Sequence, residues 1–384
     1  MVTHYDAIVL GVGGMGSAAL YHLARRGLRV LGLERYNIPH EMGSSHGLTR
    51  IIRLAYYEHP SYVPLLRRAY ELWRHLEHTV QERLLYITGS IDASAEDGEV
   101  FTGSKASCEI HHLPHEILNH AQIQARFPGY RLPPGIVAVY QPDGGFLLAE
   151  RCVVAHVMAA LDLGAEVHGQ EPVLGWEPRG NGVAVQTESQ RYSADKLVIC
   201  AGAWGAKLIP ELAGLAVPER QVLAWFQPLR PALFQPSRFP VFNMAVEEGR
   251  YYGFPVYGIP GFKVGRYHHL EQRVDPDDMD RQAHRKDEDV LRRYTARYFP
   301  DAAGPTMSLK TCLFTNTPDE HFILDLHPSL PQVSIAAGFS GHGFKFCSVI
   351  GEIMADLAQH AESRHDLGLF RLKRFQASFT GASA

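Results

Sequence analysis

The chain has few cysteines, and none of the spacings that would join them into a framework. Its five cysteines, an odd number, stand at positions 108, 152, 200, 312 and 347 without clustering. This usage argues against a disulfide-stapled secreted fold and favours a reducing compartment. No HxH, HExxH or paired CxxC motif occurs, although the chain has 21 histidines. We therefore expect no metal site.

Long apolar runs and an excess of one charge are also missing. The longest apolar stretch, from Ile8 to Tyr21, is interrupted by glycines and is shorter than the roughly 18 residues that a membrane span requires. The formal net charge is -4, from 37 basic and 41 acidic side chains, so there is no bulk attraction to nucleic acid or to an anionic membrane. A strand pattern starts at Tyr5 with no cationic segment before it, and the last residues are not Ser-Lys-Leu. We expect a cytoplasmic protein without nucleic-acid or membrane partners.

What the chain does have is the composition and length of a soluble two-domain enzyme. Apolar residues make up 46% and charged residues 20% of its 384 residues. The run from Asp6 to Leu10 predicts a buried strand, Gly14 to Gly27 a helix, and Leu28 to Leu33 a second buried strand. These three elements form a βαβ unit with short connections.

The rest of the chain alternates between this α/β character and stretches of short strands and Pro-rich loops. The pattern predicts a helix over 60–80, a helix over 150–163, a strand around Val173 leading into a hairpin turn at 179–182, a strand over 196–201, strands over 322–326 and 333–337, and a helix over 346–359. No internal repeat or low-complexity linker occurs. We predict an α/β domain from residues 1–87, 147–216 and 320–384, and an α+β domain from residues 88–146 and 217–319.

The turn after the first strand carries a dinucleotide fingerprint. Gly11, Gly13 and Gly16 form GxGxxG between a strand and a helix. They would permit a tight turn, close approach to a pyrophosphate, and close packing of the helix on the strand. Glu34, at the end of the second strand, suits ribose hydroxyls. A glycine-rich turn with no ligand is the alternative, and the motif does not choose between NAD and FAD.

Four further segments resemble a known family. They are Gly43-Ser-Ser-His46-Gly-Leu-Thr-Arg50-Ile-Ile-Arg53, Tyr251-Tyr-Gly-Phe254-Pro, Thr317-Pro-Asp-Glu320-His-Phe-Ile-Leu-Asp325 and Gly338-Phe-Ser-Gly-His-Gly343-Phe-Lys345-Phe. Together they resemble the monomeric sarcosine oxidase family, with its sisters N-methyl-L-tryptophan oxidase and peroxisomal sarcosine/pipecolate oxidase. The matches run in the family's order from residue 5 to about residue 375. The resemblance implies a monomer with a glutathione-reductase-type FAD-binding Rossmann domain and an interleaved mixed-sheet substrate domain.

The resemblance also implies a covalently held FAD. Cys312 stands where the family forms an 8α-S-cysteinyl thioether, although from sequence alone it would pass for a small core residue. Gly341 and Gly343 precede a helix start whose N–H groups and dipole can stabilise negative charge on a reduced flavin. The other implied cofactor contacts are Ser44, Arg50, Val173 and Lys345.

Two cations are implied to bind the carboxylate of an amino-acid substrate. Arg53 offers a fork that matches a carboxylate, and Lys345 would support it from the helix start. The alternative for each is a solvated surface cation. On the other face, Lys263 would supply a fixed positive charge that promotes electron transfer to oxygen. Arg50 would assist it, or else contact an FAD phosphate or the surface.

His46 and Tyr252 are implied to position the substrate and seal the site. Tyr251 and Phe254 could equally belong to the core, since one face of a strand is buried. Arg266 is an extra residue relative to the bacterial pattern. The insertion leaves open whether His268 or His269 faces the substrate, and we predict His268.

The implied activity is oxidative demethylation of sarcosine or a related N-methyl amino acid with O₂, which gives formaldehyde, the amino acid and H₂O₂. Three alternatives remain. The first is an imino-acid oxidase acting on L-pipecolate or proline. The second is a dehydrogenase of the same fold with a non-oxygen acceptor. The third is an NAD-linked reductase or a non-catalytic dinucleotide-binding protein, which would be colourless rather than yellow.

Overall fold

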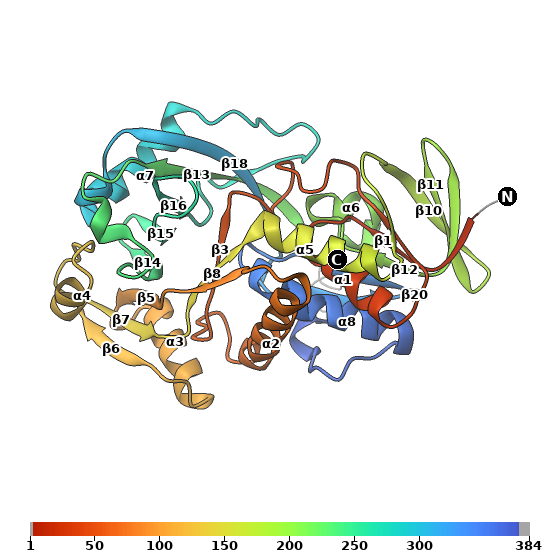
Figure 1. The fold of residues 1–384 in the computed structure, drawn as a ribbon, viewed down its shortest axis with the longest axis horizontal. Coiled ribbons are helices and arrows are strands. Elements are labelled where there is room, and N and C mark those ends of the chain that lie inside the picture. Colours follow the sequence, from red (N-terminus) through yellow and green to blue (C-terminus); the bar gives the residue numbers. More distant parts are fainter. Residues whose placement is uncertain (1–2, 376–384) are drawn as a thin grey trace, which may run out of the picture.

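The computed structural model describes residues 3–375. Its two lobes each contain a large sheet (Figure 1). Chain segments cross between the lobes several times, so each sheet is assembled from parts of the chain that are far apart in sequence.

The first sheet has eight strands and a parallel centre. Its order is β9-β2-β1-β12, with β20 also parallel to β12, while β10 and β11 form an antiparallel hairpin on β12 and β19 pairs antiparallel with β20. The central strands are apolar on both faces because both are covered. The eight strands are β1 (Thr3–Leu10), β2 (Val30–Leu33), β9 (Glu166–His168), β10 (Val173–Arg179), β11 (Gly182–Thr187), β12 (Arg191–Ile199), β19 (Ile323–His327) and β20 (Leu330–Ala337).

Four helices stack beside this sheet. The helix α1 packs against both α5 and α8, and α2 packs against the same two. Gly351 lets α8 approach α1 closely, because a Cβ there would lie 2.5 Å from the Ala18 carbonyl carbon. The helices of this lobe are α1 (Gly14–Arg25), α2 (Tyr62–Val80), α5 (Ala149–Asp162), the short α6 (Gly205–Leu208) and α8 (Cys347–His360).

The second sheet has nine strands and is mostly antiparallel. Its order is β17-β13-β16-β15-β14-β5-β7-β6, with β18 on β13 and a parallel pair between β14 and β5. Its strands are β5 (Ser90–Ala95), β6 (Glu116–Asn119), β7 (Ile136–Gln141), β13 (Val217–Phe226), β14 (Val241–Val246), β15 (Gly249–Phe254), β16 (Phe262–Arg266), β17 (Gln272–Arg273) and β18 (Thr306–Asn316). The helices of this lobe are α3 (Glu99–Ile110), α4 (His120–Arg126) and α7 (Arg285–Tyr298).

The alternation of side chains along these strands separates two environments. Tyr251 and Phe262 join an aromatic cluster with Tyr294 of α7 on one face. Their neighbours Tyr252 and Lys263 point to the opposite face, because successive residues of a strand alternate. That opposite face is turned toward the first lobe and carries the groups considered below.

A three-stranded antiparallel sheet connects the lobes. It orders β3 (Thr49–Ile52), β8 (Gly145–Leu148) and β4 (Leu85–Ile87), with β8 in the middle. The predicted domain limit at 146/147 falls inside β8, whereas the limits at 87/88, 216/217 and 319/320 fall between elements. We propose the predicted division with β8 kept whole.

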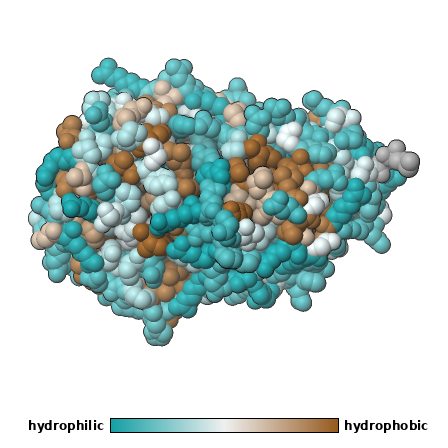
Figure 2. Space-filling model, in the orientation of Figure 1, coloured by the Kyte–Doolittle hydropathy of each residue, from teal (hydrophilic) through white to brown (hydrophobic). Residues whose placement is uncertain are grey.

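The predicted helices and strands of the first lobe all form, with ends within a few residues of those expected. Within residues 3–375, no helix is both long and apolar enough to cross a bilayer. The face in Figure 2 is largely hydrophilic, with an apolar patch over α5, where Met158, Leu161 and Leu163 are exposed.

Candidate active site

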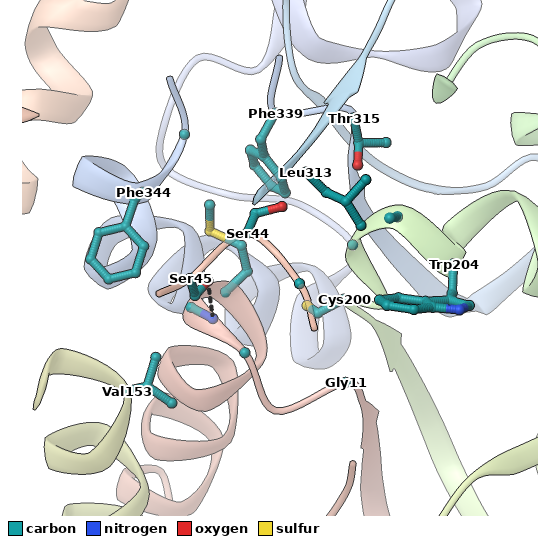
Figure 3. A pocket seen from close by; sticks show the side chains of 18 of the residues that line it. Gly11, Ser44, Ser45, Val153, Cys200, Trp204, Leu313, Thr315, Phe339 and Phe344 are labelled. Atoms are coloured by element: carbon teal, nitrogen blue, oxygen red, sulfur yellow. Dashed lines mark hydrogen bonds between the residues drawn. The ribbon is translucent and has the colours of Figure 1, made fainter. Parts of the chain in front are cut away.

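One cavity of about 360 Å³ runs from the glycine turn of the first lobe to the inward face of the second sheet. Its wall draws on segments from all parts of the chain, as Figure 3 shows for Ser45, Trp204, Leu313 and Phe344. The predicted site residues that line it are Gly11, Gly13, Glu34, Ser44, Arg50, Val173, Tyr252, Cys312, Gly341, Gly343 and Lys345. His46, Arg53 and Lys263 are buried and do not line the cavity, His268 is half-buried and does not line it either, and Gly16 allows α1 to pack closely on β1.

The glycine turn is built as its motif requires. Gly11 has a φ of 85°, and a Cβ on it would lie 2.7 Å from the Cys200 carbonyl oxygen. A Cβ on Gly16 would lie 1.7 Å from the Gly11 carbonyl oxygen, so only glycine lets α1 sit this close to β1. The N-terminus of α1 has no side-chain cap from its own N-cap residue. The Ser45 hydroxyl accepts from the Gly14 N–H, and the remaining N–H groups of the first turn, with the positive dipole, can meet phosphate oxygens.

Glu34 lies beside this turn at the end of β2. Its carboxylate accepts hydrogen bonds from the backbone N–H of Val12 at 2.8 Å and of Tyr36 at 3.0 Å. These bonds fix its orientation and leave acceptor capacity for ribose hydroxyls. The Glu171 N–H donates to the Glu34 carbonyl oxygen at 2.8 Å, which brings Val173 to the same end of the cavity.

Cys312 of β18 faces the cavity beside a cation. Its Sγ lies 3.7 Å from an Arg50 guanidinium nitrogen, and the same nitrogen donates to the Ser44 carbonyl oxygen at 2.7 Å. The pairing of β18 with β13 fixes the thiol in place, opposite Gln221. The thiol is thus buried, rigidly held and in contact with the space that a ligand would fill.

The loop before α8 brings backbone into the cavity. Gly341 has a φ of 78°, and a Cβ on it would lie 2.4 Å from the Phe314 ring. A single 3₁₀ turn over 344–346 then leads into α8, and neither start has a side-chain cap. Free N–H groups at this place can stabilise an anionic ligand edge.

Lys345 lines the cavity and has no carboxylate partner within residues 3–375. Its Nζ donates to the His342 carbonyl oxygen at 2.7 Å and lies 5.2 Å from the centre of the Tyr56 ring. Burial, and then the nearby Arg53, lower the pKa of Lys345 to about 7. A carboxylate ligand would relieve this unfavourable environment by pairing with the ammonium.

Arg53 is not brought to the wall, because two buried carboxylates already hold it. Its guanidinium lies 3.0 Å from Glu58 and 3.3 Å from Asp92. Burial opposes the charged form, but Asp92 and Glu58 outweigh it and raise the pKa of Arg53. Tyr56 and Tyr57 stack on the guanidinium at 4.5 and 4.9 Å. Arg53 therefore lowers the pKa of Lys345 without itself lining the cavity.

Lys263 lies under the wall next to Arg50. Its Nζ donates to the carbonyl oxygens of Gly47 at 2.7 Å and Thr49 at 2.6 Å, and to the Thr49 hydroxyl at 3.1 Å. Burial, and then Arg50, lower its pKa well below the usual value. His46 is its buried neighbour, and both ring nitrogens lack a partner within residues 3–375. Burial and then Arg50 lower the pKa of His46 to about 3, so the ring is neutral.

Neither histidine of the 268–269 pair reaches the cavity. His268 is bridged between Glu219 at 3.1 Å and Glu320 at 2.9 Å, and these carboxylates raise its pKa to about 9. His269 is buried against Asp287 at 3.1 Å. The preceding residue, Tyr267, lines the cavity instead. Sequence reasoning missed Tyr267, and the extra Arg266 was the only signal that the register changes here.

Other wall residues carried no signal in the sequence. Phe314, Phe339 and Trp204 line the cavity, and aromatic side chains of this kind are more often core. Ser45 was also not predicted to line the site. Its hydroxyl accepts a hydrogen bond from the Gly14 N–H at 3.1 Å (Figure 3).

Comparisons with known proteins agree with this geometry. The family model described as FAD dependent oxidoreductase matches residues 6–357. The chain is 41% identical over 379 residues to the monomeric sarcosine oxidase of Streptomyces avermitilis, covering 97% of this chain and 98% of that protein. It is 35% identical to the N-methyl-L-tryptophan oxidase of Yersinia pseudotuberculosis, covering 97% of this chain and 100% of that protein.

Solved structures share the fold. NikD, described as an unusual amino acid oxidase essential for nikkomycin biosynthesis, superposes with a TM-score of 0.84 at 26% identity, covering 96% of this chain and 98% of that one. The glycine oxidase of Geobacillus kaustophilus gives a TM-score of 0.81 at 20% identity, covering 97% and 99% of the two chains, and is evidence for the fold alone. The predicted fold class is confirmed.

Proposed function

Since this chain belongs to the FAD dependent oxidoreductase family, we infer that it is a flavin-dependent oxidase of N-methyl amino acids. The observation that carries this is the single cavity that joins the dinucleotide turn to Cys312 and Lys345. We further propose that the enzyme is monomeric and cytoplasmic. The name of its sarcosine oxidase relatives and its five unpaired cysteines support this.

The residues present fit FAD. The glycine turn and the start of α1 suit the pyrophosphate, Glu34 suits the ribose, and the loop before α8 offers N–H groups to the flavin. We propose that Cys312 would hold the flavin through a thioether to its 8α-methyl carbon, with Arg50 beside the sulfur. The C–S bond would replace the thiol S–H and one methyl C–H bond, with loss of two protons, and oxygen would take up the two electrons released. Bound there, FAD would supply the two-electron redox chemistry that links an amine donor to oxygen.

The substrate end of the cavity suits a small amino acid. Lys345 attracts the carboxylate, and the aromatic walls from Tyr252, Phe254 and Phe339 exclude water. A desolvated, cationic chamber favours the free amine over the ammonium form, and the free amine is the reactive form. Negative charge that develops on oxygen would favour the protonated form of Lys263, whose pKa burial lowers, and Lys263 and Arg50 would together stabilise that charge.

The depressed pKa of Lys345 predicts how carboxylate affinity depends on pH. Lys345 is protonated below about pH 7 and neutral above it in the empty site. We expect acetate to bind with constant affinity below pH 7 and to weaken about tenfold per pH unit above it. Acetate has no amine to titrate, so calorimetric titration from pH 6 to 9 isolates the lysine. In Lys345→Arg the pH dependence should vanish, and an unchanged slope in that variant would contradict the assignment.

The proposed activity is tested by peroxide formation in a coupled peroxidase assay. We expect turnover with sarcosine and with other N-methyl amino acids, and formaldehyde in equal amount. Preference for L-pipecolate or proline would indicate that the enzyme oxidises a ring C–N bond instead of an N-methyl group. Flavin reduction without peroxide would indicate a dehydrogenase. No reaction with any secondary amino acid would refute the proposal.

A further inference from the structure

Tyr267 is half-buried and lines the cavity, and its hydroxyl makes no hydrogen bond within residues 3–375. Tyr57 also has a hydroxyl without a partner in residues 3–375, but it does not line the cavity, and two other nearby tyrosines are hydrogen bonded. The Tyr56 hydroxyl hydrogen bonds with His342 at 2.6 Å, and the Tyr62 hydroxyl with His321 at 3.1 Å. An unpartnered hydroxyl inside a molecule is costly unless a ligand or water meets it.

The local backbone explains why this residue faces the cavity. The strand β16 pairs with β15 as far as Arg266, opposite Tyr251, and the Tyr267 N–H donates to the Arg250 carbonyl oxygen at 2.8 Å. His268 then takes a φ of 50°, which turns the chain away. Its ion pairs with Glu219 and Glu320 hold this bend. The ring of Tyr267 is left edge-on to Tyr252, with centroids 5.2 Å apart.

A buried arginine stacks on the Tyr267 ring. The Arg250 guanidinium carbon lies 3.8 Å from the ring centroid, and Glu320 holds the guanidinium at 3.7 Å. A cation over a phenol ring withdraws charge and strengthens the O–H as a donor. Burial raises the pKa of Tyr267 to about 12, although Arg250 opposes it, so the phenol keeps its proton at neutral pH.

Resting on the proposed function, we propose that Tyr267 donates a hydrogen bond to the substrate carboxylate beside Lys345, and that Arg250 positions its ring. Arg250 and Arg53 lower the pKa of the Tyr267 phenol, whereas Glu58 and Glu320 raise it, so these four groups largely offset one another. Lys345 lines the same cavity and has no carboxylate partner within residues 3–375. A neutral O–H donor on the same wall as this ammonium suits a carboxylate better than an amine. The hydroxyl thus adds directional recognition to the charge of Lys345.

The test is the affinity of acetate, measured by isothermal titration calorimetry at pH 6.5 on the purified holoenzyme. We expect Tyr267→Phe to weaken acetate binding roughly tenfold or more, the effect of one hydrogen bond to a charged group. The substrate KM should rise by a similar factor while kcat stays within about twofold. Tyr251→Phe is the matched control and should change neither, because that ring stacks on Tyr294 at 3.7 Å on the far face of the sheet.

Because Arg250 acts by positioning the Tyr267 ring, the effect of replacing Arg250 on acetate affinity should depend on whether Tyr267 is present. We expect Arg250→Met to weaken acetate binding by a smaller factor and to add nothing to Tyr267→Phe, while Arg250→Lys restores part of the loss. Equal acetate affinity in Tyr267→Phe and the wild type, or no acetate binding by the wild type, would overturn the proposal. Acetate binding needs no turnover, so an enzyme that binds acetate but oxidises no amine would refute the proposed function alone.

Discussion

Replacing Cys312 with serine is expected to leave the flavin extractable. Acid-precipitated wild-type protein should stay yellow, whereas the Cys312→Ser precipitate should be colourless with free FAD in the supernatant. The expectation rests on where the Cys312 thiol lies. The thiol is 4% exposed, lines the cavity and lies 3.7 Å from Arg50. The serine oxygen keeps the size of the side chain but not the nucleophilicity of sulfur.

A second cysteine on the same wall gives a matched control. Cys200 also lines the cavity and is 8% exposed, but it lies beside the glycine turn rather than near Arg50. Cys200→Ser should therefore keep its colour on precipitation. Retained colour in Cys312→Ser would show that another residue, or none, attaches the flavin.

Replacing Lys263 with methionine is expected to slow the reaction with oxygen by about 100-fold or more, the typical effect of losing a group that stabilises developing charge. Anaerobic reduction by substrate should change little. Lys263 is buried, and three oxygen acceptors from Gly47 and Thr49 hold its Nζ beneath the cavity wall. Stopped-flow measurement of the two half-reactions separates these effects.

The control for this variant is a lysine on the rim of the same lobe. Lys310 is part-exposed and pairs with Glu41. Lys310→Met removes the same charge without entering the buried layer, and it should leave both half-reactions unchanged. An equal slowing of reduction and reoxidation in Lys263→Met would contradict a role specific to oxygen.

Local patterns predicted the first lobe well because its determinants are local. The turn from Gly11 to Gly16 and the buried strands on either side of α1 each carry their own signature. The second sheet could not be predicted in the same way. Its pairs join β5 to β14 and β13 to β18, across more than eighty residues, and no short pattern specifies them.

The same limit applies to the site residues. A motif placed Arg53 near the substrate, but no motif shows that Glu58 and Asp92 occupy its guanidinium. Likewise, the sequence predicted a histidine in the cavity wall, but Tyr267 lies there instead. The extra residue Arg266 and the bend at His268 account for the difference. The structure brings Cys312 and Lys345 to the cavity wall, but the resemblance to a family, and no local pattern, suggested them, and their roles stay predictions.

Anaerobic mixing of the purified enzyme with sarcosine, followed by air, tests whether electrons pass from an N-methyl amino acid through FAD to oxygen in this one cavity. We predict that the flavin absorbance bleaches on mixing, and that air restores it with one H₂O₂ formed per flavin. A flavin that stays oxidised with sarcosine, N-methyl-L-tryptophan, L-pipecolate and proline would contradict the claim.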